Sequence, residues 1–382
     1  MKRIGFSGTL DPITNGHMWV IGEARAMADE VFVFLSENPS KKPQFPPEKR
    51  KQIIELSAAE RGWNNVKIVI LKGEYTARAA KRHGIDYLIR GIRNTSDFDY
   101  ENLIQQTNVD VLHGAKTIFV MPPRDLGSVS SGFVKNLQGP LGWHWHMKKF
   151  VPVPAYDAWL LDWLDKEWAS LWDARDLDAQ TRDRRDRWFA HLSGASCYGD
   201  TRRCYHNRDH LVHGLTEIGV WAENTSADKH DVDTIKKAFW FHDAVYDYTP
   251  ADLSNEEASA RLWLDSGLAA NGDGEPAQLI RATDHFQGAS ISHRLKDIML
   301  GADLAILGQD DEIYDAYAES IRAEYSHVPD ASYQAHRLKA LSHLMQKAQN
   351  RKLYADDYFS ALYNDKAIVN MTREIDRLAG QK

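Results

Sequence analysis

The stretch Ser7-Gly8-Thr9-Leu10-Asp11-Pro12-Ile13-Thr14-Asn15-Gly16-His17 decides how the first part of the chain folds. It follows a short apolar run, Ile4 to Phe6, and leads into a segment with helical spacing. A glycine-bearing loop between a strand and a helix presents backbone N–H groups to phosphate, and the helix dipole favours the same anion. The stretch therefore predicts a phosphate-binding loop with His17 in the first helical turn. An ordinary turn with a surface histidine is the alternative.

Strand and helix patterns alternate around this loop. The apolar runs that predict buried strands are Ile4 to Phe6, Val31 to Leu35, Val66 to Leu71, Tyr87 to Ile89 and Thr117 to Met121. Helical spacing lies between them, so we expect βαβ units and a parallel sheet covered on both faces. After Pro152 and Pro154 only helical periodicity follows. We therefore expect an α/β domain over residues 1–150 and an all-α domain over residues 151–382, with a linker from the Gly139-Pro140 turn to Pro154.

The composition limits which partners the protein can bind and which cellular compartment it can occupy. The chain has 382 residues, a formal net charge of -7 and two cysteines. The net charge argues against a broad surface for nucleic acid or acidic membranes. Two thiols make no disulfide framework, and we see no signal peptide and no long apolar run. These features predict a cytoplasmic globular protein without nucleic-acid or membrane partners.

Two further elements follow predicted strands, at the sheet edge where ligands bind in open α/β folds. Arg90-Gly91-Ile92-Arg93 comes after Tyr87 to Ile89, and two arginines beside a glycine suit a phosphate. Ser128-Val129-Ser130-Ser131 follows the fifth strand, where hydroxyl and N–H groups can hold a triphosphate. The alternatives are a solvated charged loop for the first element and an ordinary N-cap for the second.

Together these elements resemble bacterial phosphopantetheine adenylyltransferase over residues 1–138. The resemblance implies a Rossmann-like nucleotidyltransferase domain. Its family transfers the adenylyl group of ATP, with Mg²⁺, to 4'-phosphopantetheine, and releases dephospho-coenzyme A and pyrophosphate. His17 would stabilise charge on the transferring phosphorus. The residues placed on the phosphopantetheine side are Thr9, Lys41, Thr76 and Arg90. Those placed on the ATP side are Thr9, Leu10, His17, Gly91, Ile92, Arg93, Glu101, Ser130 and Ser131.

The sequence departs from the family pattern in places. Leu10 stands where the family usually has an aromatic residue, and Gly132 ends a run that is commonly three serines. The family's enzymes commonly form hexamers, so a homo-oligomer is expected, and the appended domain is a further departure from the family pattern. An acceptor such as nicotinamide mononucleotide is the alternative substrate. The segment from Arg90 to Glu101 argues against it, because the nicotinamide enzymes carry different late motifs.

The second half carries histidines and aspartates in apolar helical surroundings. His210 lies in Tyr205-His206-Asn207-Arg208-Asp209-His210, and an adjacent His242-Asp243 pair follows Phe239-Trp240-Phe241. Asp303 lies within Ala302-Asp303-Leu304-Ala305-Ile306-Leu307-Gly308. Burying such groups is costly unless they are paired or bind a metal. Imidazoles with carboxylates suit Mn, Fe, Co or Zn, or Mg with water ligands.

This pattern resembles the HD-domain metal-dependent phosphohydrolases over residues 155–382. The resemblance implies that His210, His242, Asp243 and Asp303 hold the metal, which activates water and polarises a phosphoryl oxygen. Asp247, expected one helical turn after Asp243, would take a proton, and His285 would add a ligand or a phosphate contact. The resemblance thus predicts a bifunctional enzyme whose second substrate is an unknown phosphoester. The alternative is a regulatory HD domain that binds a nucleotide without cleaving it.

Overall fold

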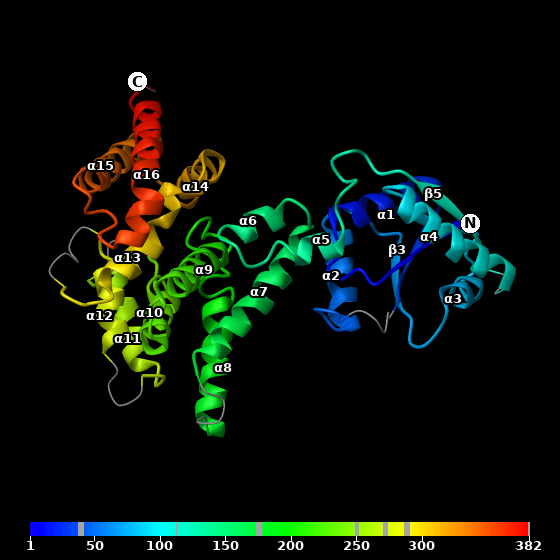
Figure 1. Cartoon of the computed structure of the whole chain (residues 1–382), viewed down its shortest axis with the longest axis horizontal. Helices are drawn as coiled ribbons and strands as arrows, with labels where there is room; N and C mark the ends of the chain where they lie inside the picture. Colours follow the sequence, from blue (N-terminus) through cyan, green and yellow to red (C-terminus); the bar gives the residue numbers. More distant parts are fainter. Residues whose placement is uncertain are drawn as a thin grey trace. The chain divides into compact units, whose positions relative to one another are not determined.

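The computed structural model describes residues 1–36, 42–111, 114–172, 178–248, 252–269, 274–285 and 291–380. Contacts divide the chain into two compact units. Unit 1 comprises Met1–Gly139 and Trp143–Trp159, and unit 2 comprises Pro140–Gly142 and Leu160–Lys382. Figure 1 shows strands in the blue-to-cyan unit 1 and helices alone in the green-to-red unit 2. The predicted succession of an α/β region and a helical region is confirmed.

Unit 1 is built on one parallel sheet whose strand order is β3-β2-β1-β4-β5. The strands are β1 (Arg3–Gly8), β2 (Glu30–Leu35), β3 (Val66–Ile70), β4 (Tyr87–Gly91) and β5 (Lys116–Val120). All five predicted strands are confirmed. Because β1 pairs with both β2 and β4, the chain reverses its direction of travel across the sheet between β1 and β4. The loops after these two strands consequently lie beside each other at the carboxyl edge, where open α/β sheets bind ligands.

Helices cover both faces of this sheet. They are α1 (Asn15–Met27), α2 (Pro47–Ala59), α3 (Thr76–Arg82), α4 (Thr95–Gln106), α5 (Ser131–Lys135) and α6 (Trp143–Lys148), and a π-helical turn, Thr107–Val111, follows α4. Alternate strand residues point to opposite faces. Phe32 and Phe34 pack with the alanines of α3 on one face, whereas Phe6 lies beside the ring of His17 in α1. This arrangement explains why the strands read as continuous apolar runs.

Unit 2 consists of helices within its described residues. They are α7 (Val153–Ser170), which begins in unit 1, α8 (Ala179–Ser193), α9 (Arg208–Thr225), α10 (Lys229–Phe241), α11 (Asn255–Asp265), α12 (Glu275–Ala282), α13 (Lys296–Leu304), α14 (Asp311–Glu324), α15 (Asp330–Gln349) and α16 (Asp357–Ala379). A 3-10 turn, Ala305–Gly308, continues α13. In the described part of the chain, no helix is long and apolar enough to cross a membrane.

The segment expected to be a linker is instead packed structure. Trp143 and Met147 of α6 are buried, and the Trp159 indole N–H donates to Gln138 Oε1 at 2.8 Å. The boundary between the units therefore falls inside α7, between Trp159 and Leu160, rather than at residue 150. Glycine and proline residues mark turns at the ends of this segment, but the apolar residues between them pack it onto unit 1.

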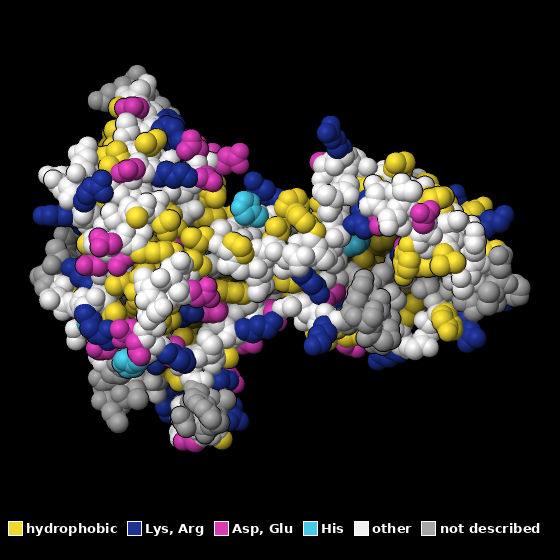
Figure 2. Space-filling model, in the orientation of Figure 1, with side chains coloured by type: hydrophobic (Ala, Val, Ile, Leu, Met, Phe, Trp, Pro, Cys, Tyr) yellow, Lys and Arg dark blue, Asp and Glu magenta, His cyan; other side chains and the backbone are white. Residues whose placement is uncertain are grey.

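Surface charges are mixed in sign. Figure 2 shows Lys and Arg side chains interspersed with Asp and Glu over the drawn face. Several of them are neighbours one helical turn apart, such as Lys166 with Asp162 and Lys229 with Asp233. Exposed pairs of this kind contribute about 0–1 kcal/mol each, so the fold does not depend on them.

The close packing of α9 on α10 positions part of unit 2. A Cβ added at Gly214 of α9 would lie 1.9 Å from Cζ of Phe239, so the ring occupies the space of a missing side chain. Phe239 also lies against His210 and His242, with ring centroids 5.5 Å and 4.5 Å away. Gly214 thus lets two helices that carry histidines approach each other.

We predict that Gly214→Ala destabilises the protein by about 1–3 kcal/mol, the usual cost of overpacking a core. Gly219→Ala, in the same helix, is the control, because its new Cβ meets nothing within 4 Å. The control should be neutral or stabilising by up to ~1 kcal/mol, since alanine favours helix. Urea unfolding followed by circular dichroism measures both. Equal stability of the two variants would contradict the packing described for Gly214.

Candidate active sites

A cavity of about 650 Å³ lies in unit 1 at the carboxyl edge of the sheet. Its walls come from the segments that follow β1, β4 and β5. The residues predicted from the sequence that line it are Thr9, Leu10, His17, Arg90, Gly91, Arg93, Glu101, Ser130 and Ser131. Sequence elements far apart along the chain are therefore brought to one site, as expected from the parallel sheet.

The remaining predicted residues of unit 1 take other positions. Ile92 is buried and does not line the cavity in the described structure. Thr76 opens α3, and its hydroxyl lies 3.0 Å from the hydroxyl of Ser7, a cavity residue. Lys41 lies outside the described residues.

His17 is fixed by the first turn of α1. The Thr14 N–H donates to His17 Nδ1 at 3.0 Å, and the Thr14 hydroxyl accepts from the His17 N–H at 3.4 Å. Since Nδ1 accepts a hydrogen bond from the backbone, the neutral ring carries its hydrogen on Nε2. The ring therefore lines the cavity with a defined tautomer, next to the positive end of a helix.

Two arginine side chains that line the cavity are each held by a carboxylate. Arg90 Nε donates to Glu101 Oε2 at 2.7 Å, and a second nitrogen of Arg90 donates to the Ser7 carbonyl. Arg93 Nε donates to Asp97 at 2.7 Å. Such pairs hold the guanidinium groups at the cavity wall, where their remaining N–H groups can meet phosphate oxygens.

Lys135 and Asp11 are site residues that the sequence interpretation missed. Lys135 Nζ lies 2.5 Å from Asp11 Oδ2, and both residues line the cavity. Asp11 also accepts the N–H groups of Gln44 at 2.6 Å and Phe45 at 3.1 Å. Its position in the sequence, one helical turn after Ser131, could have identified Lys135 as a site residue.

The two serines serve structural roles as well. Ser130 caps α5 by accepting the Phe133 N–H, as the ordinary N-cap alternative expected, and the Ser131 hydroxyl donates to the Pro12 carbonyl at 2.8 Å. The Ser131 bond attaches the segment after β5 to the loop after β1. Both serines still line the cavity.

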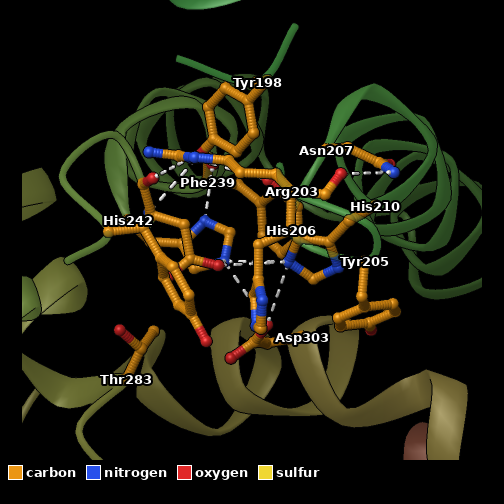
Figure 3. A network of polar contacts seen from close by, with 12 residues as sticks. Tyr198, Arg203, Tyr205, His206, Asn207, His210, Phe239, His242, Thr283 and Asp303 are labelled. Atoms are coloured by element: carbon orange, nitrogen blue, oxygen red, sulfur yellow. Dashed lines mark hydrogen bonds and ion pairs between the residues drawn. The ribbon is translucent and has the colours of Figure 1, made fainter. Parts of the chain in front are cut away.

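Unit 2 brings His210, His242, Asp243 and Asp303 together. Figure 3 shows His210 and His242 pointing toward each other, with Asp303 beside both. The two Nε2 atoms are 3.0 Å apart, and Asp303 Oδ1 is 3.4 Å from each of them. Asp243 Oδ2 lies 3.1 Å from His242 Nε2 and 3.6 Å from His210 Nε2. The predicted residues thus form one cluster of nitrogen and oxygen donors.

The surrounding fold orients this cluster. His242 Nδ1 lies 2.8 Å from the Phe239 carbonyl, which only accepts, so Nδ1 carries a hydrogen and Nε2 faces the cluster. Arg203 donates to the carbonyls of Asp243 at 2.7 Å and Ala244 at 3.1 Å. The Asp243 N–H donates to the Tyr198 hydroxyl at 3.2 Å. The sequence interpretation missed Arg203 and Tyr198, which fix the turn after α10.

Burial and neighbouring charges shift the pKa values of the cluster residues. Burial lowers the pKa of His210. Burial acts in the same direction on His242, but the carboxylates of Asp243 and Asp303 outweigh it and raise the pKa of His242 well above its ordinary range. Burial alone would raise the pKa values of both aspartates, yet His242 lowers them. Positive charge among the imidazoles, from a proton or a metal cation, therefore stabilises the two aspartates.

Two other predicted residues have different positions. His285 Nε2 lies 3.1 Å from Asp303 Oδ2, at the edge of the cluster. Asp247 is exposed, and its backbone pairs with the side chain of Asn255. The expectation that Asp247 lies one helical turn after Asp243 is wrong, because α10 ends at Phe241 and the chain is not helical beyond it.

Comparison with known proteins addresses unit 1. Residues 6–138 match the cytidylyltransferase-like family. A phosphopantetheine adenylyltransferase from Chromobacterium violaceum is 35% identical over 156 residues, which cover 41% of this chain and 94% of that protein. Proteins of the same name from Lacticaseibacillus paracasei and Neisseria meningitidis serogroup C are 36% and 32% identical, and cover 41% and 42% of this chain and 92% and 94% of their own. Through unit 1, the chain belongs to the phosphopantetheine adenylyltransferase family.

Proposed function

We propose that unit 1 transfers the adenylyl group of ATP to 4'-phosphopantetheine, giving dephospho-coenzyme A and pyrophosphate. The observation that carries this proposal is the cavity that joins His17 at a helix N-terminus to Arg90 and Arg93. Its place at the sheet edge suits a nucleotide and a second phosphate together. Membership of the phosphopantetheine adenylyltransferase family supports this acceptor over nicotinamide mononucleotide.

The chain's residues act by positioning and by charge. An oxygen of the acceptor phosphate forms a bond to the α-phosphorus of ATP while the bond to the pyrophosphate oxygen breaks. No protein side chain makes a covalent bond in this transfer, so catalysis rests on alignment and charge stabilisation. His17 Nε2–H donates to an oxygen of the transferring group, and Lys42 and Lys135 add positive charge at the wall. Mg²⁺ bound with ATP neutralises phosphate charge.

Acceptor choice tests the proposal directly. The full chain with ATP, Mg²⁺ and 4'-phosphopantetheine should release pyrophosphate steadily and form dephospho-coenzyme A. Nicotinamide mononucleotide should give little or no release, because the sequence from Arg90 to Glu101 resembles the pantetheine enzymes and the nicotinamide enzymes carry different late motifs. Steady release with nicotinamide mononucleotide and none with phosphopantetheine would overturn the proposed acceptor.

His17→Ala should lower kcat by about two decades or more, the scale of losing one preorganised donor to developing charge. The KM for ATP should change less, because the interaction strengthens in the transition state. His146→Ala, which removes an exposed histidine of the same unit, is the matched control and should keep kcat. Pyrophosphate release under saturating substrates measures both variants. An unchanged kcat in His17→Ala would remove this residue from the mechanism.

For unit 2 we propose metal-dependent hydrolysis of a phosphoester by an HD-type site. The observation that carries it is that ligand atoms of His210, His242 and Asp303 all lie within 4.8 Å of one another. With Asp243 they offer two imidazole nitrogens and two carboxylates, a donor set that suits Mn, Fe, Co or Zn. The residues present therefore fit a cation, which also provides positive charge beside the two largely buried aspartates.

The side chains of unit 2 would hold and orient this cation. His210 and His242 present Nε2, while the Phe239 carbonyl keeps the hydrogen of His242 on Nδ1. A bound divalent metal lowers the pKa of water and polarises a phosphoryl oxygen. His285, at the edge of the cluster, is placed to orient Asp303.

Asp243→Ala should abolish tight binding of one or two divalent metals per chain, because it removes a carboxylate from the cluster. Adenylyl transfer should persist, since the two sites share no residue. Asp247→Asn is the matched control and should keep the metal, because Asp247 is exposed and lies outside the cluster. Elemental analysis of the purified variants measures both. A wild-type protein without transition metal, and without hydrolysis in added Mn²⁺, Co²⁺ or Mg²⁺, would instead favour the regulatory alternative.

A further inference from the structure

A buried arginine lies behind the loop that follows β1 in unit 1. Arg50 belongs to the first turn of α2 and is 3% exposed. Its Nη1 donates to the backbone carbonyl of Thr9 at 2.6 Å. Thr9 lines the cavity, whereas Arg50 does not. Arg50 therefore supports the cavity loop from the side that lies away from the cavity.

The charge of Arg50 is not balanced by a neighbouring carboxylate. Within the described part of the chain no carboxylate pairs with its guanidinium, and its Nε has no hydrogen-bond partner there. A buried arginine that only stabilises a fold is normally paired, because an unpaired buried charge is costly. This charge lies directly behind a loop that is proposed to bind phosphates. A phosphate bound at the loop would supply the missing negative charge.

The residue after Thr9 has an unusual backbone conformation. Leu10 has a φ of 50°, in the left-handed region that leucine rarely adopts. Such a conformation persists only where the surrounding structure holds it, and it is found mainly at functional sites. Arg50 holds the carbonyl before Leu10, and the Asp11 carboxylate after it accepts two backbone N–H groups from the segment before α2. Leu10 is thus held on both sides.

The bond from Arg50 to Thr9 also sets the direction of the next N–H group. In a trans peptide the carbonyl and the following N–H point in opposite directions. Since the Thr9 carbonyl points to Arg50, the Leu10 N–H points away from Arg50, and Leu10 lines the cavity. Among the described residues no acceptor for this N–H is present. The Leu10 N–H is therefore available to a phosphate oxygen.

We propose that Arg50 is a positioning residue for adenylyl transfer. It touches neither substrate. Through the Thr9 carbonyl it holds Leu10 in its left-handed conformation and keeps the Leu10 N–H directed toward the transferring phosphate. This inference rests on the adenylyl transfer proposed for unit 1. A donor that is fixed in advance raises the rate because it needs no reorganisation when charge develops, so the loss of Arg50 affects kcat more than substrate binding.

The test measures pyrophosphate release by the full chain with ATP, Mg²⁺ and 4'-phosphopantetheine. Arg50→Met removes the guanidinium but keeps a long side chain, and it should lower kcat by about 10–10²-fold, the scale of a misplaced catalytic group. The KM values of both substrates should stay within about threefold of the wild type, because the donor acts mainly in the transition state. Arg50→Lys keeps the charge and one donor without the guanidinium geometry, so its kcat should fall by about three- to tenfold.

Arg61→Met provides the matched control. Arg61 follows the end of α2, is exposed, and donates to the Ser57 carbonyl at 3.0 Å, so this variant should keep the kcat of the wild type. An Arg50→Met protein with an unchanged kcat, whether or not its KM rises, would overturn the positioning role.

Circular dichroism shows whether each variant is folded. If Arg50→Met does not fold, folded Arg50→Lys decides the question, and a wild-type kcat in that variant would overturn the role of Arg50 as well. A wild type that forms no dephospho-coenzyme A would instead refute the proposed adenylyl transfer itself, and the inference with it.

Discussion

Charges removed from water must be paired, and both sites of this chain are organised around that constraint. In unit 1 the cations at the cavity wall are held by carboxylates, as Arg90 is by Glu101 and Lys135 is by Asp11. These pairs keep a positively charged wall in place before a phosphate arrives. In unit 2 the largely buried Asp243 and Asp303 face two imidazoles, and positive charge placed among these groups stabilises them. The same constraint thus underlies the anion site proposed for one unit and the cation site proposed for the other.

The fold contributes to each site in a different way. The parallel sheet places every loop that follows a strand at one edge, so the phosphate-binding loop before α1 lies beside the segment after β4. The helical unit has no such edge, and its site depends on close helix packing. The absence of a side chain at Gly214 lets α9 approach α10, and Arg203 fixes the turn that carries Asp243. Membership of the phosphopantetheine adenylyltransferase family supports the site in unit 1, whereas the site in unit 2 is supported by the chemistry of its clustered side chains.

The sheet of unit 1 and the site at its edge could be predicted from the sequence. Strands that are buried on both faces appear as apolar runs, and a parallel sheet places the loops after its strands at one edge. The metal-type cluster was also predictable, since charged residues in apolar helices require compensation. Other features depend on contacts between distant residues. His206 Nδ1, for example, lies 3.1 Å from Glu324 Oε1, although the two residues are 118 positions apart in the sequence. Asp247 was misplaced because the end of α10 at Phe241 carries no strong stop signal.

Anomalous diffraction tests most directly whether the cluster of unit 2 binds a cation. Crystals of the full chain grown with Mn²⁺ should show an anomalous peak within about 2.0–2.6 Å of the ligand atoms of His210, His242, Asp243 and Asp303. The peak would show that a metal supplies the positive charge that the cluster requires. The absence of any peak there, with the four side chains in the same arrangement, would contradict the account and mean that a proton balances the cluster.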